Sequence, residues 1–288
     1  MLLPLLFAAS MLMVSDRANF WDDNKVAPQT QFGEVNELGI TKLLDPTAIQ
    51  QFEGKRVLVL VHGFATPQAC YPYFTAQANL LEEGSPYDAI IGYIWPCYTN
   101  HLAYLQAKSH ADQVAPRLKT FLKLLQPVAS RIDVAAHSLG NRLVLKALDL
   151  KTSAPALIHN FLSIAPAVDN EAIEMGKEFF NSTQHCTNLY VFFSHQDSVL
   201  RWAYLASEWD KALGYDGAEN PNKLPQNVQM IDCTNIIDSH DGYLFSKPIF
   251  SFIQQAAWML PSEFAMAQNL FFTPDGMFNI FDPQSMLP

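Results

Sequence analysis

The sequence predicts an α/β fold in which a mostly parallel sheet of about six to eight strands is covered by helices on both faces. Short apolar runs alternate with helix-length amphipathic segments along one continuous span of the chain. Several runs are apolar at every position, as expected of strands that are buried on both faces. The alternation predicts a single domain over residues 1–260. Residues 261–288 are expected to be irregular and are open to three interpretations: a packed tail, an arm of a homodimer, or a partly disordered end.

The expected elements follow from local patterns. After an N-terminal apolar stretch, strands are expected at residues 56–62, 89–95, 132–136, 158–166, 189–194 and 228–233. Helices are expected at residues 67–83, 101–126, 140–150, 171–181, 200–213 and 243–259. Pro116 should kink or divide the second of these helices. The chain has no room for a large cap domain between the fourth and fifth of these strands, since only about 22 residues lie there.

Composition excludes several classes of protein. The 288 residues are 49% hydrophobic and 16% charged, which provides a large core and excludes general disorder. Lys and Arg number 18 against 28 Asp and Glu, for a net charge of −10, and no basic run exists, so neither nucleic acid nor an anionic membrane is an expected partner. Four cysteines without C-x-x-C spacing indicate neither a zinc site nor a disulfide framework, and they suit a reducing compartment.

The N-terminal segment has two interpretations. It is apolar for about fourteen residues, the length of a signal-peptide core, but no Lys or Arg precedes Arg17. The segment is also too short to span a membrane as a helix. We therefore expect a buried first strand and a cytoplasmic protein. The alternative is an exported protein whose residues 1–15 form a signal segment.

The segment around Ser138 carries the clearest chemical signal. The strand ends in Ala136-His137-Ser138-Leu139-Gly140, and a helix follows at once. A nucleophilic serine on such a strained turn needs small residues two positions before and after it. The N–H of Leu139 would then face a developing oxyanion at the helix N-terminus. The simpler alternative is that Ser138 only caps the helix.

The segment His62-Gly63-Phe64 would supply the second half of an oxyanion hole. It follows a buried strand upstream of Ser138, and Gly63 allows the backbone to turn sharply. The N–H of Phe64 would be the second donor. We interpret His62 as a structural residue that braces this loop.

The acid and base of a serine triad are expected later in the chain, in that order. Asp197 follows the strand at residues 189–194, while Asp169 follows the preceding strand and is the alternative acid. His240 alone among the histidines lies in a loop between the last strand and the closing helix, which makes it the expected base. The alternative for His240 is an exposed histidine without a role.

Together these segments resemble the α/β-hydrolase superfamily, and more narrowly a bacterial α/β-hydrolase family of uncharacterised function. The resemblance covers residues 11–259 and rests on residues 15–17, 61–64, 93–96, 136–142, 165–169, 194–197, 231–234, His240 and Tyr243. It implies an α/β-hydrolase fold with a Ser138–His240–Asp197 triad, and it favours the N-terminal strand. Ala136 departs from the glycine that many members of the superfamily carry, which bears on the shape of the substrate pocket.

The expected function is hydrolysis of carboxylic esters through an acyl-enzyme, with a small-molecule ester as substrate and no cofactor or metal. Phosphate loops, metal-ligand clusters and dinucleotide motifs are absent from the sequence. The alternatives are an amidase or peptidase with the same triad, and a non-catalytic scaffold that binds a ligand. Trp202, Tyr204 and Tyr243 are candidates for a substrate pocket, although such aromatics also pack helices onto sheets. We expect an open cleft suited to short or medium acyl chains.

Overall fold

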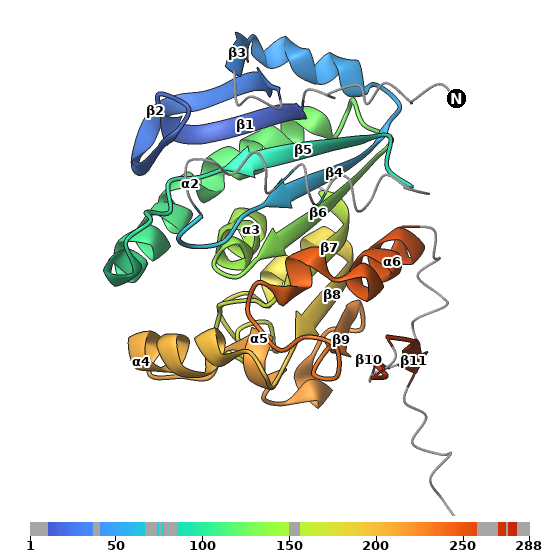
Figure 1. The fold of residues 1–288 in the computed structure, drawn as a ribbon. Coiled ribbons are helices and arrows are strands. Elements are labelled where there is room, and N and C mark those ends of the chain that lie inside the picture. Colours follow the sequence, from blue (N-terminus) through green and yellow to red (C-terminus); the bar gives the residue numbers. More distant parts are fainter. Residues whose placement is uncertain are drawn as a thin grey trace, which may run out of the picture.

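The structure, a computed structural model, forms one sheet with helices on both faces (Figure 1). It describes residues 11–36, 41–66, 86–149, 156–257, 270–274 and 276–280, together with Phe74 and Gln77. Within these residues the sheet has eleven strands, in the order β11-β10-β9-β8-β7-β6-β4-β5-β1-β2-β3.

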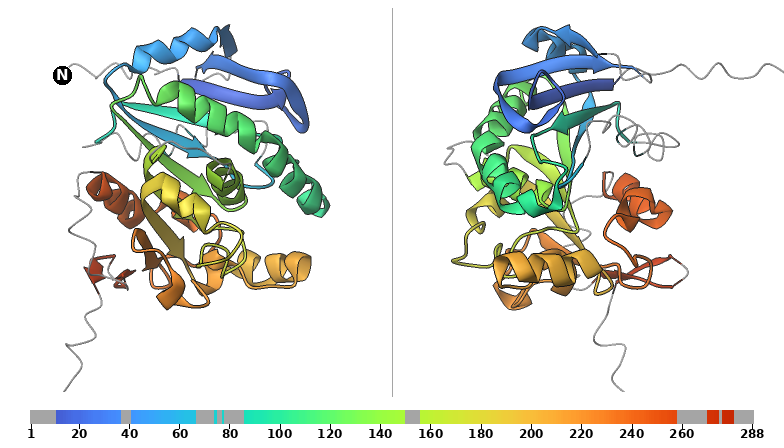
Figure 2. Two further views of the ribbon diagram at one scale, coloured as in Figure 1. Left: turned by 180° about the vertical axis from the view of Figure 1, so that it is seen from behind. Right: turned by 60° about the vertical axis from the view of Figure 1, so that its left-hand side comes forward.

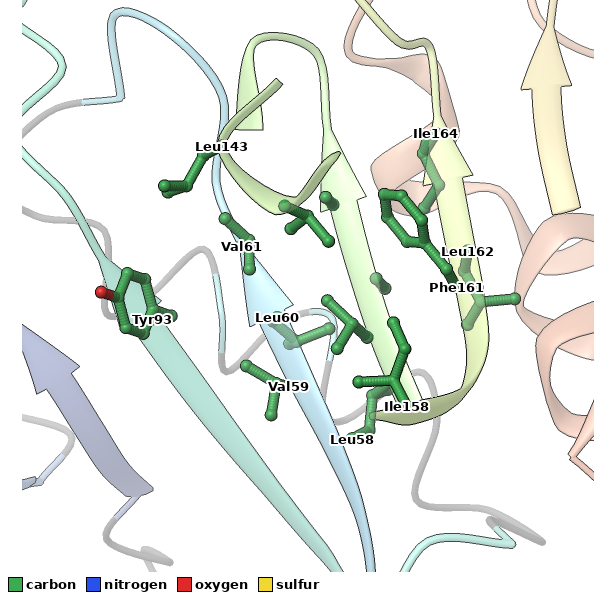
Figure 3. Close-up of a cluster of buried hydrophobic side chains, with 14 of the residues drawn as sticks. Leu58, Val59, Leu60, Val61, Tyr93, Leu143, Ile158, Phe161, Leu162 and Ile164 are labelled. Carbon is green, nitrogen blue, oxygen red and sulfur yellow. The ribbon is translucent and has the colours of Figure 1, made fainter. Parts of the chain in front are cut away.

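Six parallel strands form the centre of the sheet, and they confirm the six strands expected after the N-terminal stretch. They are β4 (Arg56–Val61), β5 (Ala89–Ile94), β6 (Arg131–His137), β7 (Ile158–Ile164), β8 (Cys186–Phe193) and β9 (Val228–Asp232). Their apolar side chains are buried on both faces and meet in a continuous core, part of which is shown in Figure 3. Because both faces are covered, these strands carry no polar alternation.

The sheet is wider than the expected six to eight strands. At one edge, β1 (Met11–Ala18) runs parallel to β5, and β2 (Asp22–Val35) and β3 (Thr41–Leu44) follow it as antiparallel strands. The first strand is thereby confirmed over residues 11–18, while residues 1–10 lie outside the described part. The outer strands were missed because they are half exposed and largely polar. In the tail, which was expected to be irregular, β10 (Leu270–Phe272) pairs with β9, and β11 (Phe278–Ile280) pairs with β10.

Helices cover both faces of the sheet. The helices α2 (Tyr104–Leu125) and α3 (Gly140–Asp149) lie on one face, and α6 (Lys247–Ala256) lies on the other (Figure 2). The helix α2 continues through Pro116 without a break, so the expected division does not occur. The helix expected at residues 67–83 lies outside the described residues, apart from Phe74 and Gln77.

Two expected helices are wrong in part. Where a helix was expected at residues 171–181, residues 171–180 form consecutive turns and bends, with Gly176 in a left-handed conformation, and the 3-10 helix η3 (Asn181–His185) begins at residue 181. The expected helix 200–213 is a short π-helix, η4 (Val199–Tyr204), continued by α4 (Leu205–Glu208). It ends at Trp209, whose φ of 61° is left-handed, and α5 (Leu213–Asp216) comes after it. These short elements form no large cap over the part of the sheet that the structure describes.

A buried polar cluster secures the amino-terminal end of β6. The carboxylate of Asp133 is fully buried and accepts hydrogen bonds from Tyr87 Oη (2.9 Å), from Arg131 Nε and Nη2 (2.9 Å each) and from the Asn160 amide (3.0 Å). The cluster joins β6 to β7 and leaves no oxygen of Asp133 without a donor. Its function is therefore structural.

We expect Asp133→Asn to lower the free energy of unfolding by about 3 kcal/mol, because removing one partner of a buried ion pair leaves the other uncompensated. The matched control is Asp88→Asn, since Asp88 pairs with Arg56 (3.5 Å) at the surface, where such pairs contribute at most about 1 kcal/mol. Denaturant titration measures both values. Equal losses in the two variants would contradict this interpretation of Asp133.

Candidate active site

The turn between β6 and α3 places Ser138 at the carboxyl end of the central strands. Ser138 has a φ of 54°, a left-handed conformation that is strained for a serine. A Cβ on Gly140 would lie 2.4 Å from the carbonyl oxygen of His62, and a Cβ on Gly63 would lie 2.9 Å from the Ser138 Cβ. Glycine at both positions therefore permits the close approach of the two loops, as expected of a nucleophile turn.

Ser138, His240 and Asp197 form one hydrogen-bonded chain. His240 Nε2 lies 2.9 Å from Ser138 Oγ, and His240 Nδ1 lies 2.7 Å from Asp197 Oδ2. An ionised carboxylate only accepts hydrogen bonds, so Nδ1 donates to Asp197 and Nε2 accepts from the Ser138 hydroxyl. The structure thus brings together the three residues that the sequence singled out as nucleophile, base and acid.

Asp197 is fixed from a second direction. Its carboxylate is fully buried, and Oδ1 accepts a hydrogen bond from the Leu200 amide at 2.9 Å. The His240 side chain is only 14% exposed. Because both carboxylate oxygens have donors, the plane of the His240 ring is held toward Ser138.

The alternative acid, Asp169, has a different partner. Tyr204 Oη donates to Asp169 Oδ1 at 2.7 Å, and the Asp169 backbone forms an isolated β-bridge with Ala212. Burial raises the pKa of Asp169, and the hydrogen bond from Tyr204 only partly offsets this effect. Asp169 therefore belongs to the packing of the segment after Asp197.

The three pocket candidates lie in different environments. Trp202 is 60% exposed, with the Arg201 guanidinium 4.6 Å from its ring centroid, and it lies at the surface. Tyr204 is buried against Asp169. Tyr243 is fully buried in the hydrophobic core, so its ring packs within the fold and does not line an open pocket as expected.

His137 is a site residue that the sequence analysis did not single out. A backbone carbonyl can only accept, so His137 Nε2–H donates to the His240 carbonyl oxygen at 3.0 Å. The two rings are 4.7 Å apart. Burial, and then the proximity of His240, lower the pKa of His137 to about 3, so this ring is neutral. In the sequence, the one indication that His137 belongs to the site was its position directly before Ser138.

Two polar backbone groups lie beside Ser138, one in the loop after β4 and one in the turn after β6. The Gly63 carbonyl oxygen accepts from His62 Nδ1 at 2.8 Å and from Thr66 Oγ1 at 3.1 Å. On the other side of Ser138, the Leu139 amide makes none of the backbone hydrogen bonds found between described residues. The Leu139 amide is therefore available to an oxygen atom bound at the start of α3.

Within the described residues, no group of three or more His, Cys, Asp or Glu side chains could hold a metal ion. In the same part of the chain, no helix is long and apolar enough to cross a membrane. Three cysteines, Cys97, Cys186 and Cys233, are buried free thiols. The absence of a cofactor and a cytoplasmic location remain predictions.

Comparison with known families identifies the class of protein. Residues 44–250 match the model of a family described as alpha/beta hydrolases of unknown function (DUF900). Since this match covers more than half of the chain, the protein belongs to that family. No curated protein matches the sequence.

Solved structures show a distant likeness. An esterase of Pyrococcus furiosus shares 13% identity over 82% of this chain and 86% of its own, with a TM-score of 0.43. A Pyrobaculum calidifontis esterase shares 14% identity over 81% of this chain and 82% of its own, with a TM-score of 0.40. An acylaminoacyl peptidase of Pyrococcus horikoshii shares 13% identity over 87% of this chain but only 36% of its own, with a TM-score of 0.34. At these scores the likeness bears on neither substrate nor reaction.

The neutral His137 makes stability depend on pH. An unfolded histidine has a pKa near 6.5, so between that value and about 3 the unfolded chain binds a proton that folded His137 does not. The free energy of unfolding therefore falls as the pH is lowered through this window. We expect His137→Asn to reduce this dependence by up to about 1.4 kcal/mol per pH unit. Denaturant titrations of parent and variant across the window measure the difference, and identical slopes would contradict the assignment.

Proposed function

We propose that this protein is a serine hydrolase that cleaves carboxylic esters through an acyl-enzyme. The observation that carries the proposal is the hydrogen-bonded chain from Ser138 Oγ through His240 to the buried Asp197. A hydroxyl is a weak nucleophile until a neighbouring base removes its proton, and the base must itself be oriented by a third group. Here the base and its orienting carboxylate both lie at hydrogen-bonding distance.

In the proposed reaction Ser138 Oγ attacks the ester carbonyl carbon while His240 Nε2 takes the hydroxyl proton. Asp197 holds the Nδ1–H tautomer of His240 and stabilises the imidazolium that forms. Collapse of the tetrahedral intermediate expels the alcohol, which receives its proton from His240. Water, activated by the same histidine, then hydrolyses the acyl-enzyme and regenerates Ser138.

The proposed oxyanion hole consists of the backbone N–H groups of Phe64 and Leu139. The unused Leu139 amide and the start of α3 support one half, because N–H groups at a helix N-terminus favour negative charge. The contact of Gly63 with Ser138 supports the other half, since it brings the Gly63–Phe64 peptide beside the nucleophile. Each such donor contributes about 3 to 4 kcal/mol to transition-state stabilisation.

The substrate we propose is a small ester with a short or medium acyl chain. The described helices between β8 and β9 are short, and Trp202, on the first of them, is exposed at the surface. An open cleft shields a long chain poorly from water, so additional methylene groups gain little binding energy.

Ser138→Ala should leave the protein folded and reduce ester hydrolysis by about 10⁴-fold or more, because no other group at the site supplies the nucleophile. A fluorophosphonate probe should label the parent protein and not this variant. The experiment also separates the proposal from a non-catalytic scaffold, since an unlabelled, inactive parent protein would contradict an enzymatic function.

Asp197→Asn should be severely damaging, by about 10⁴-fold in kcat, because an amide at this position favours the wrong imidazole tautomer. The matched control is Asp169→Asn, which removes an equivalent charge one strand away and should leave kcat within about threefold. Steady-state kinetics on one ester compares the variants. A large loss of kcat in Asp169→Asn, together with near-parental kcat in Asp197→Asn, would show that the acid has been assigned to the wrong residue.

A panel of p-nitrophenyl esters of graded length, with matched anilides, tests the substrate class. We expect kcat/KM to fall from butyrate or octanoate toward palmitate, without a rise when the substrate passes its solubility limit. Anilides should react more slowly than the matched esters. Faster cleavage of anilides would favour an amidase or peptidase, and activation on a long-chain emulsion would exclude an open cleft.

A further inference from the structure

A buried guanidinium lies behind the loop at residues 62–66. Arg17, on β1, is fully buried, and its Nε donates to the Trp95 carbonyl oxygen at 2.9 Å. Its Nη2 donates to the Thr66 carbonyl oxygen at 3.0 Å and lies 3.4 Å from His62 Nε2. Among the described residues, its Nη1 has no hydrogen-bond partner and no carboxylate forms an ion pair with it; the neighbouring Asp16 pairs with Arg117 instead. Such a group is costly to bury. The contacts of the Arg17 guanidinium therefore indicate what this buried charge does in the structure.

The contacts of His62 determine which nitrogen carries its proton. The Trp95 amide, which can only donate, lies 3.1 Å from His62 Nε2, so Nε2 is the unprotonated nitrogen. Nδ1 then carries the proton and donates to the Gly63 carbonyl oxygen at 2.8 Å. Burial, and then the charge of Arg17, lower the pKa of His62 well below its usual range, which keeps the ring neutral in this tautomer. The ring also stacks on Trp95, with centroids 5.4 Å apart, so it cannot turn freely.

The direction of the Gly63 carbonyl determines the direction of the Phe64 N–H. The two groups belong to one trans peptide and point in opposite directions. Gly63 O is held by His62 Nδ1–H and Thr66 Oγ1–H, so the Phe64 N–H points away from His62. If this peptide were flipped, its N–H would face two donors, and its carbonyl would face the position required for an oxyanion donor.

We propose that Arg17 and His62 are positioning residues that hold the Gly63–Phe64 peptide with its N–H directed into the oxyanion hole. Arg17 acts at two points: it fixes the neutral His62 through Nε2, and it holds the far end of the loop through the Thr66 carbonyl. Ala65, between the two points, has a left-handed φ of 57°, a conformation that requires such support. The inference rests on the proposed function, because it assigns the orientation of one of the two donors.

Substitutions of His62 test the hydrogen bond to Gly63 directly. The amide of His62→Asn places a donor where Nδ1 was, whereas His62→Leu removes the donor and keeps the volume. We expect His62→Leu to lower kcat by about 10²-fold, as for loss of one oxyanion donor, with KM changed less than about threefold. The kcat of His62→Asn should be at least about tenfold higher than that of His62→Leu. Equal kcat values in the two variants would overturn the proposal.

Arg17→Met tests the guanidinium, and Arg117→Met is its matched control. Arg117 is a neighbouring cation that contacts Asp16 (3.3 Å) and the Ala27 carbonyl (2.7 Å) and makes none of the contacts of Arg17 with the loop. We expect Arg17→Met to lower kcat by about 10- to 10²-fold and to weaken binding of a boronic acid, which mimics the tetrahedral intermediate, by a similar factor. Arg117→Met should leave kcat unchanged. A folded Arg17→Met with parental kcat and boronate affinity would overturn the proposal.

Thr66→Val provides a test that does not depend on replacing a buried charge. It removes the second donor to Gly63 O while keeping the shape of the side chain, and we expect kcat to fall by about 3- to 10-fold. If Arg17→Met does not fold, the His62 pair and Thr66→Val decide the question. These variants test the loop separately from the proposed function. If the proposed function were wrong, ester hydrolysis by the parent protein would not depend on Ser138.

Discussion

The left-handed backbone of Ser138 is the constraint around which the site is arranged. A conformation of this kind costs a serine about 1 to 3 kcal/mol, so its surroundings must impose it. The Ser138 amide donates to the Ile164 carbonyl at 3.0 Å, and its carbonyl accepts from the amides of Asn141 (3.1 Å) and Ala167 (3.2 Å). The turn is therefore held by β7, by the loop after β7 and by α3 at once. The strain has a chemical consequence, because it lifts the hydroxyl out of the strand toward His240.

Two neutral histidines fix the loops that neighbour this turn through hydrogen bonds. His62 connects the loop after β4 to Trp95, and His137 connects the turn at Ser138 to the His240 backbone. In each ring one nitrogen must donate to a carbonyl, which is possible without a charge only in one tautomer. Burial lowers the pKa of both rings, and so their hydrogen-bond directions stay constant at neutral pH. In the proposed reaction, the proton of Ser138 therefore passes to His240, which lies at hydrogen-bonding distance.

The sequence was most informative where local sterics and chain order act together. A buried strand followed by Ala136, Ser138 and Gly140 permits few structures, and the order of triad residues then selected Asp197 and His240. Sequence patterns could not reveal β2 and β3, whose half-exposed residues lack a strand signature. They also did not reveal the end of α4 at Trp209, because a left-handed backbone is uncommon for a tryptophan. The burial of the Arg17 side chain and its contacts with the loop after β4 were also not predicted, because nothing in a linear sequence distinguishes a buried arginine from a surface one.

The two ends of the parallel strands use their polar groups differently. At the amino end of β6, the two oxygens of Asp133 accept hydrogen bonds from four donors, so no acceptor site is left for a ligand. At the carboxyl end, Ser138 Oγ hydrogen bonds only to His240 among the described residues, and the Leu139 amide makes no backbone hydrogen bond there. A polar group that is fully satisfied within the protein stabilises it, whereas one held in place with capacity to spare can bind a reacting atom. This difference, more than the presence of a serine, is why we propose the reaction at the carboxyl edge of the sheet.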